Sequence, residues 1–388
     1  MLAWLAFLVV HRTGNFMSHI ATRELSKRGF MVLGMNPRSD NNEAAVRFEY
    51  NALDIRQGVE FLRKQPGITK VILIGHSGGG PAATYYEATA ENGVSYCQGP
   101  DKISQCPDTV AGLPKADAIV LLDAHPGNSI NALRGLNPAV VDDADPRKID
   151  PALDPFNPAN GFNPNCDSTY SKEFQTRYFR AQAERMNRLI DKAQKLQADM
   201  RAGLHVPTDD DVFVLYHARA RLSDLSTGVA CCTARTERLL KNDGAIVTEM
   251  IKTVRRPQPE NAKRDSMFGE EGTMLLTVKS FLSGNAIRAN NSQDDIDWCS
   301  SNNSTVCAVG KISIPILVTS MQAHYFIADG EIIYDHASSK DKEFLVIEGA
   351  LHGLTPCVPC QTTPGQYSNT VNNLFNYIRD WTNKRFAN

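Results

Sequence analysis

The stretch from Val71 to Ala83, VILIGHSGGGPAA, limits the possible folds of this chain more than any other feature. Its first four residues are all apolar, which is typical of a parallel strand covered on both faces. Pro81 is tolerated in the first turn of a helix, and Ala82–Ala90 continues with residues that suit a helix. The stretch therefore predicts a strand, a sharp turn and a helix, with Ser77 at the apex of the turn.

The turn has the pattern G-x-S-x-G, with Gly75 and Gly79 two residues on either side of the serine. Larger residues there would bring Cβ atoms into collision across the turn. A phosphate-binding P-loop is excluded because it needs a lysine where Pro81 stands. The remaining alternative is a serine that only caps the helix. Because strand, turn and helix all fall where the motif requires them, we expect Ser77 to be a nucleophile.

Apolar strands alternate with helical patterns over the first 125 residues, which predicts a doubly wound, mostly parallel sheet of the α/β class. The helical patterns have apolar residues at intervals of three and four. We expect strands at Ala3–Val10, Phe30–Met35, Val71–Ile74 and Ala118–Leu122, and helices at Ser18–Arg28, Ala52–Lys64 and Ala82–Ala90.

The strand series stops at residue 126 and resumes near residue 312. Connections of that length are rarely without structure, and Ser171–Leu204 and Thr233–Val254 are expected to be helical. The sequence thus predicts a core formed by residues 1–125 and 312–388, with a mainly helical lid inserted at 126–311. The second part of the core has expected strands at Ile314–Thr319 and Phe344–Ile347 and a final helix at Tyr367–Lys384.

Three motifs make the chain resemble the α/β-hydrolase superfamily. They are GHSGG in the turn, HRTGN after the first strand, and IEGALHG near the end. The resemblance covers the two core segments, from the third strand of that fold to its last helix, while the insertion matches no family. It implies a triad in the chain order serine, acid, histidine. His352, in the loop after the last strand, is then the expected base.

The acid departs from the usual pattern of this superfamily. Its usual place, just after Ile314–Thr319, is held by His324, which cannot supply a fixed negative charge. Asp123 ends the preceding strand in Leu-Leu-Asp-Ala-His-Pro, and some lipases resembling the pancreatic type have their acid in a similar setting. We therefore expect Asp123 to be the acid. The alternatives are Glu331, Asp329 and Glu348, although Glu331 is expected to lie on a helix at Gly330–Ser338.

An oxyanion hole needs two N–H groups aimed where charge develops. The resemblance implies Gly78 as one donor and Thr13 as the other, with Gly14 as the alternative to Thr13. Arg12 stands where the superfamily commonly has glycine. It is a candidate for binding a substrate carboxylate, although a salt bridge at the surface or to the lid is the stronger expectation. His76 is a second candidate for contact with the substrate.

These parts predict acyl transfer to water through an acyl-enzyme. A large lid favours an enclosed pocket, so the expected substrate is a carboxylic ester or amide of a bulky small molecule. Hydrolysis of a lactone or of a carbon–carbon bond remains open. A non-catalytic protein that binds a ligand on the same fold is the alternative from another class. No cofactor and no metal are expected.

Composition excludes several partners. A net charge of −2 gives no long-range attraction to nucleic acid, and no stretch of 18 apolar residues predicts a membrane span. The opening MLAWLAFLVV lacks the charged start and the cleavage site of a signal peptide, so it is expected to be a buried strand. No hairpin precedes that strand, so either the fold is trimmed at this edge or residues upstream of Met1 are missing. The oligomeric state stays open.

Nine cysteines are many for a cytosolic enzyme. Short-range pairs in polar loops predict disulfides and hence a secreted or periplasmic protein rather than a cytoplasmic one. The CxxC could bind zinc only with a second close pair, and an adjacent pair is all that the chain offers. An odd number leaves at least one cysteine unpaired. The expected disulfides are Cys97–Cys106 and Cys299–Cys307; the CxxC is Cys357 and Cys360, and the adjacent pair is Cys231 and Cys232.

Overall fold

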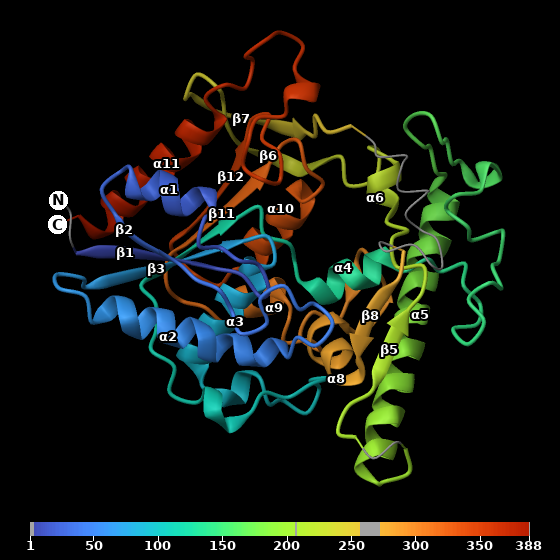
Figure 1. Cartoon of the computed structure of the whole chain (residues 1–388). Coiled ribbons are helices and arrows are strands. Elements are labelled where there is room, and N and C mark those ends of the chain that lie inside the picture. Colours follow the sequence, from blue (N-terminus) through green and yellow to red (C-terminus); the bar gives the residue numbers. More distant parts are fainter. Residues whose placement is uncertain (1–3, 206–207, 257–271, 388) are drawn as a thin grey trace.

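An eight-stranded sheet forms the centre of the computed structural model, which describes residues 4–205, 208–256 and 272–387 (Figure 1). The strand order is β2-β1-β3-β4-β11-β12-β6-β7, and every neighbouring pair is parallel except β6 and β7. The predicted fold class is confirmed. The strands are β1 (Leu5–Val10), β2 (Met31–Gly34), β3 (Lys70–His76), β4 (Ala118–Leu122), β6 (Cys232–Leu240), β7 (Ile246–Lys252), β11 (Ile316–Met321) and β12 (Lys342–Ile347).

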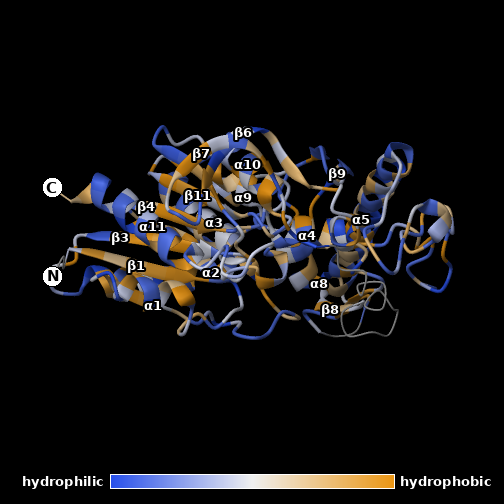
Figure 2. Cartoon of the chain, turned by 90° about the horizontal axis from the view of Figure 1, so that it is seen from above, coloured by the Kyte–Doolittle hydropathy of each residue, from blue (hydrophilic) through white to orange (hydrophobic). Residues whose placement is uncertain are grey.

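Helices cover both faces of this sheet, which is why its strands are apolar at successive positions. Along β1, Ala6 and Leu8 pack into one hydrophobic core, while Leu5 and Phe7 pack into the other. Seen from above, the strands are largely hydrophobic between more hydrophilic helices (Figure 2). One face carries α1 (Ile20–Ser26) and α11 (Thr370–Phe386); the other carries α2 (Asn51–Arg63), α3 (Gly79–Asn92), α9 (Thr305–Val309) and α10 (Ile327–His336).

Part of the inserted segment packs around a core of its own. Ile130, Met186 and Phe281 belong to a buried cluster that is separate from the two cores of the sheet. The long helix α5 runs along the side of the molecule away from both termini (Figure 1). This part contains α4 (Asn128–Gly135), α5 (Lys172–Arg201), β5 (Val212–Leu215), α6 (Leu222–Leu225), β8 (Met274–Thr277), α8 (Val278–Ser280), the π-helical η5 (Phe281–Asn285), β9 (Ala289–Asn291) and β10 (Asp295–Ile296).

The helix predicted over Thr233–Val254 is wrong, because this segment forms the hairpin β6–β7. The hairpin joins the main sheet through parallel pairing of β6 with β12. Asn242-Asp243-Gly244 forms the turn, with Gly244 at φ +89°, a conformation that glycine adopts without steric cost. An Asp-Gly turn is a hairpin signal, and here it outweighs the helical spacing of the apolar residues. The inserted segment is therefore less helical than expected.

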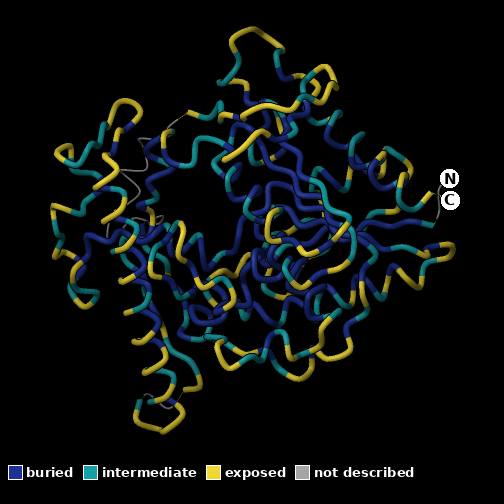
Figure 3. Tube along the Cα trace, turned by 180° about the vertical axis from the view of Figure 1, so that it is seen from behind, coloured by how far each residue is buried: buried dark blue, intermediate teal, exposed yellow. Residues whose placement is uncertain are grey.

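Most of the other elements lie where the sequence predicts them, with ends displaced by a few residues. The helix predicted over Ser171–Leu204 is the continuous α5, and Ser171 caps it by accepting from the N–H of Phe174. Ala3, expected to start the first strand, lies outside the described residues. Exposed residues concentrate on the outer helices and loops, including one end of α5 (Figure 3). Within the described ranges, no helix combines the length and apolar character needed to cross a bilayer.

The cysteines pair as predicted. The Cα atoms are 5.5 Å apart in Cys97–Cys106 and 5.1 Å apart in Cys299–Cys307, and the sulfurs are at bonding distance. The CxxC cysteines and the adjacent pair are also bonded, at Cys357–Cys360 and Cys231–Cys232. Cys166 remains as an exposed free thiol.

Candidate active site

Ser77 lies in the turn between β3 and α3, with φ +56°. Such a backbone conformation is costly for a residue other than glycine and persists only where the surroundings enforce it. A Cβ on Gly75 would lie 2.5 Å from the carbonyl oxygen of Gly79, across the turn, as the sequence predicts. A Cβ on Gly79 would instead overlap the carbonyl oxygen of Val10, at the end of β1. The neighbouring strand therefore also requires a glycine here.

His352 and Asp123 meet Ser77 at the carboxyl ends of the central strands. His352 Nε2 lies 2.9 Å from Ser77 Oγ, and His352 Nδ1 lies 2.6 Å from Asp123 Oδ2. Asp123 directly follows β4, is fully buried, and accepts at Oδ1 from the backbone N–H of Met321. The three predicted residues thus form one chain of hydrogen bonds.

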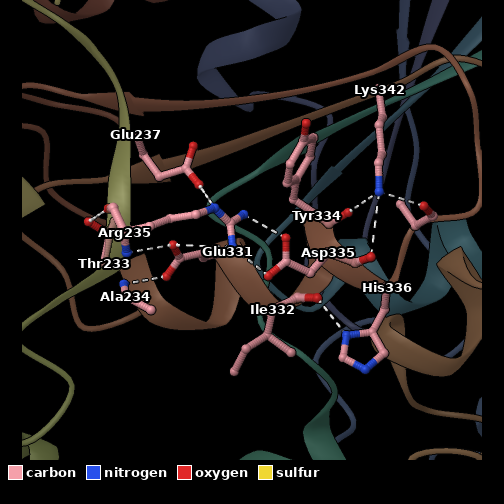
Figure 4. A network of polar contacts seen from close by, with 11 residues as sticks. Thr233, Ala234, Arg235, Glu237, Glu331, Ile332, Tyr334, Asp335, His336 and Lys342 are labelled. Carbon is pink, nitrogen blue, oxygen red and sulfur yellow. Dashed lines mark hydrogen bonds and ion pairs between the residues drawn. The ribbon is translucent and has the colours of Figure 1, made fainter. Parts of the chain in front are cut away.

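The carboxylate of Glu331 points away from this chain. It accepts from the backbone N–H groups of Ala234 and Arg235, at 2.7 and 3.3 Å, and so ties α10 to β6 (Figure 4). Glu331 is therefore not the partner of His352.

The other two predicted alternatives are also engaged elsewhere. Asp329 forms an ion pair with Arg134 at 2.7 Å. Glu348 accepts from the side chain of Lys241 and, at 2.7 Å, from the backbone N–H of Asn242. Asp123 is the one carboxylate among the four candidates that contacts His352.

His324, which stands in the usual place of the acid, lies beside His352 and approaches the same oxygen of Asp123. Its Nδ1 is 2.8 Å from Asp123 Oδ2, but the angles are outside hydrogen-bond geometry. The ring of His324 stacks on that of His352, with centroids 4.4 Å apart. Burial lowers the pKa of His324, although Asp123 opposes this shift. Burial also opposes ionisation of Asp123, but the two histidines hold its pKa below the usual value.

Asp123, His324 and His352 also form a group of three potential metal ligands, whose atoms lie within 4.8 Å of one another. Two ligands of a tetrahedral zinc ion are about 3.3 Å apart, given metal–ligand bonds of about 2.0 Å. The separations of 2.6 and 2.8 Å between these nitrogens and the carboxylate oxygen are shorter. These distances do not fit coordination of one zinc ion by all three groups, and the contact between His352 and Asp123 is a hydrogen bond.

The N–H groups of Thr13 and Gly14 point at a neighbouring side chain rather than at Ser77. Both donate to His11 Nδ1, at 3.1 and 2.6 Å. The predicted use of either N–H in the oxyanion hole therefore does not agree with this structure. Gly78 lies at the N-terminus of α3, where the first N–H groups have no partner within the helix.

Two histidines that the sequence analysis left out lie beside Gly78. His11 Nδ1 accepts two hydrogen bonds and His125 Nδ1 accepts one from the N–H of Gly127. Both rings therefore carry their proton on Nε2 when neutral. A Cβ on Gly78 would lie 2.8 Å from His11 Nε2 and 3.4 Å from His125 Nε2. Burial, followed by the charge of Arg12, lowers the pKa of His11 to about 3 and also lowers that of His125.

His76, predicted as a possible substrate contact, instead supports the loop of the base. Its Nε2 lies 2.8 Å from the backbone carbonyl oxygen of His352, and its Nδ1 lies 3.0 Å from His19 Nε2. His19 Nδ1 in turn accepts from the N–H of Ala21. Because His19 Nδ1 is an acceptor, His19 Nε2–H donates to His76 Nδ1, and His76 Nε2–H donates to the carbonyl oxygen of His352. One tautomer of each ring is therefore fixed.

Arg12 forms the salt bridge that the sequence favoured, with Glu43 as its partner. It also lines a cavity of about 300 Å³ that contains Ser77, Gly78 and His352. A second cavity of about 450 Å³ shares Arg12 and Glu43 with the first and extends to residues of the inserted segment. The two cavities therefore adjoin, with Arg12 in the wall of both.

No protein-family model and no curated protein sequence matches this chain. Solved structures with a similar fold include a monoacylglycerol lipase from Paleococcus ferrophilus (12% identity, 97% of this chain and 94% of that chain, TM-score 0.41). A proline iminopeptidase from Mycobacterium smegmatis has 12% identity over 98% of this chain and 90% of its own (TM-score 0.37). The α/β hydrolase GrgF from Penicillium sp. sh18 has 10% identity over 99% and 91% (TM-score 0.41). At these values the likenesses say nothing about activity or substrate.

Proposed function

We propose that this chain, which has the α/β-hydrolase fold, is a serine hydrolase that transfers the acyl group of a carboxylic ester or amide to water. The observation that carries this proposal is the chain of hydrogen bonds from Asp123 through His352 to Ser77, at 2.6 and 2.9 Å. A carboxylate hydrogen-bonded to His352 supports this proposal over the alternative of a non-catalytic protein on the same fold.

Each residue has a defined task in the proposed reaction. His352 Nε2 takes the proton of Ser77 Oγ as the oxygen attacks the carbonyl carbon, and later gives that proton to the leaving group. Asp123 accepts the Nδ1–H of His352, which fixes the ring in the productive tautomer and stabilises its positive charge. His352 then takes a proton from a water molecule as the water attacks the acyl-enzyme. This step releases the carboxylic acid from Ser77.

The oxyanion hole is proposed to consist of the N–H of Gly78 and one imidazole N–H, from His11 or His125. Both rings place Nε2 close to Gly78 and are neutral donors at pH 7. Preorganised donors of this kind stabilise the charge that develops on the carbonyl oxygen. For Thr13 or Gly14 to donate to the oxyanion instead, its N–H would first have to break its hydrogen bond with His11 Nδ1.

The adjoining cavities support a bulky small molecule as substrate, as the lid predicted from the sequence implies. The cavity at Ser77 has room for the reacting group, and the larger cavity has room for a further part of the same molecule. Ligand sites of this kind typically occupy about 300–1,000 Å³. No feature of the site favours a lactone or a carbon–carbon bond over an ester or amide.

Replacement of the nucleophile tests this proposal. Ser77→Ala should lower kcat for 4-nitrophenyl esters at least about 10³-fold, because the remaining groups cannot form an acyl-enzyme. Its midpoint of thermal unfolding should stay close to that of the wild type, since only one hydroxyl is removed. Hydrolysis by Ser77→Ala at the rate of the wild type would exclude Ser77 as the nucleophile.

A further inference from the structure

The larger cavity is lined by an unusual number of charged side chains. Three arginines and two carboxylates line it, namely Arg12, Arg219, Arg221, Glu43 and Asp224. Cavities for small molecules are mostly apolar, with a few polar groups that orient the ligand. A cluster of guanidinium groups next to a proposed nucleophile therefore points to a charged part of the substrate.

Arg12 has capacity for another hydrogen bond. Its side chain is 6% exposed and pairs through Nη2 with Glu43, which is itself 56% exposed. Its Nη1 is buried and, among the described residues, has no hydrogen-bond partner. A buried donor without a partner is costly, and more so when it is charged. A ligand with an acceptor group would remove that cost.

Arg221, which also lines this cavity, provides a second such donor. Its Nη1 contacts the hydroxyl of Tyr325, its Nη2 contacts Asn131 at 3.1 Å, and its guanidinium lies over the Tyr325 ring at 4.7 Å. Its Nε is buried without a partner, and no carboxylate of the described residues forms an ion pair with it. Asn131 and Tyr325 also line the cavity at Ser77, so this arginine is held at the junction of the two cavities.

We infer that Arg12 and Arg221 form a subsite for a carboxylate of the substrate. The inference rests on the proposed function and narrows it to esters or amides that carry a second, ionised acid group. Guanidinium groups suit this task because they remain charged and donate two hydrogen bonds in the plane of a carboxylate. Glu43 and Asp224 offset part of the positive charge of the three arginines in the lining and leave an excess of one positive charge.

Matched pairs of esters test the subsite. Mono-4-nitrophenyl esters of the dicarboxylic acids from succinic to suberic acid are compared with neutral branched esters of equal size, such as the glutarate with the 5-methylhexanoate. A second series places the carboxylate on the leaving group, as in 4-acetoxybenzoate against 4-isopropylphenyl acetate. In one of the series, kcat/KM for the best anionic ester should exceed that of its neutral partner about tenfold or more.

Arginine variants assign the preference to the subsite. Arg221→Gln and Arg12→Gln should each reduce the ratio of the two kcat/KM values to below about threefold, whereas Arg221→Lys should retain part of it. The matched control is Arg235→Gln, an arginine on β6 that lies outside both cavities and should leave the ratio unchanged. Equal kcat/KM values within every pair, or a preference that survives both arginine variants, would overturn the inference.

A binding measurement separates the subsite from the proposed chemistry. Calorimetric titration of Ser77→Ala with the free dicarboxylates and with their diamides requires no turnover. The dicarboxylate should bind more tightly, and Arg221→Gln should remove the difference. If no ester is hydrolysed but this difference is found, the proposed function fails and the subsite stands. If esters are hydrolysed without such a difference and without preference, the subsite fails alone.

Discussion

Asp123 faces three groups at once, and each of them limits what its carboxylate can do. His352 Nδ1 and His324 Nδ1 lie at 2.6 and 2.8 Å from the same oxygen, and the other oxygen accepts from the N–H of Met321. Its backbone has φ +43°, a conformation that aspartate tolerates better than most residues. The carboxylate is therefore held in one place and in its ionised form, which is what a histidine base requires.

Replacing this carboxylate by an amide should keep the shape of the site and remove its charge. Asp123→Asn should lower kcat by about 10³–10⁴, because the amide no longer fixes the tautomer of His352 or stabilises its positive charge. Steady-state hydrolysis of a 4-nitrophenyl ester measures the loss, and circular dichroism checks that the fold is retained. A folded Asp123→Asn variant with kcat within tenfold of the wild type would show that another carboxylate serves the base.

At the scale of elements, the edge of the sheet depends on a contact between α10 and the hairpin β6–β7. Glu331 on α10 binds the N–H groups of Ala234 and Arg235 on β6, near the end of the strand that does not pair with β12 (Figure 4). Both N–H groups lie in the stretch of β6 where the pairing with β7 is irregular, between Cys232 and Thr236, and Glu331 supplies their acceptors.

Glu331→Gln separates this structural task from catalysis. The amide offers one acceptor in place of two and places its own N–H₂ against a donor, so the free energy of unfolding should fall by about 1–3 kcal/mol. The value of kcat should change less than twofold, in contrast to Asp123→Asn. Chemical denaturation and ester hydrolysis measured on the same preparation check both parts. A large loss of kcat with unchanged stability would return Glu331 to the list of candidate acids.

The central parallel strands and the turn at Ser77 were predictable because their constraints are local. A strand covered on both faces must be apolar throughout, and the close approaches at Gly75 and Gly79 exclude side chains. The hairpin β6–β7 was missed because helical spacing was given more weight than its Asp-Gly turn. The positions of the Thr13 and Gly14 N–H groups could not be predicted, since they depend on how His11 packs after folding.

The site was also predictable only in part, because some of its features depend on contacts between distant segments. Ser77 and His352 follow strands with strong sequence signals, and Asp123 follows β4 in the same way. The tautomers of His11 and His125, and the support that His76 gives to the loop of the base, depend on hydrogen bonds between distant segments. The sign in the sequence that His125 lies near the site is its position two residues after Asp123.

On the scale of the whole molecule, six of the nine histidines gather around the site, and five of them have a pKa below the ordinary value of 6.5 because of burial. Burial lowers the pKa of His11 to about 3 and that of His19 to about 4. The five are His11, His19, His76, His125 and His324.

This group makes the stability of the fold sensitive to acid. Between about pH 6.5 and 4 the unfolded chain binds more protons than the folded one, so the free energy of unfolding should fall as the pH is lowered through this range. Each histidine contributes a slope of up to about 1.4 kcal/mol per pH unit. Urea denaturation at pH 7, 6 and 5 measures the slope. Constant or rising stability from pH 7 to pH 5 would mean that these rings are protonated in the folded protein.

The central claim is that Ser77 is activated by His352 and Asp123, and covalent labelling tests it most directly. A fluorophosphonate phosphonylates an activated serine, with loss of fluoride, and the mass of the intact protein reports the adduct. The wild type should gain the mass of one phosphonyl group, located at Ser77 by peptide mapping, and Ser77→Ala should gain none. An unlabelled wild type, or equal labelling of Ser77→Ala, would contradict the account.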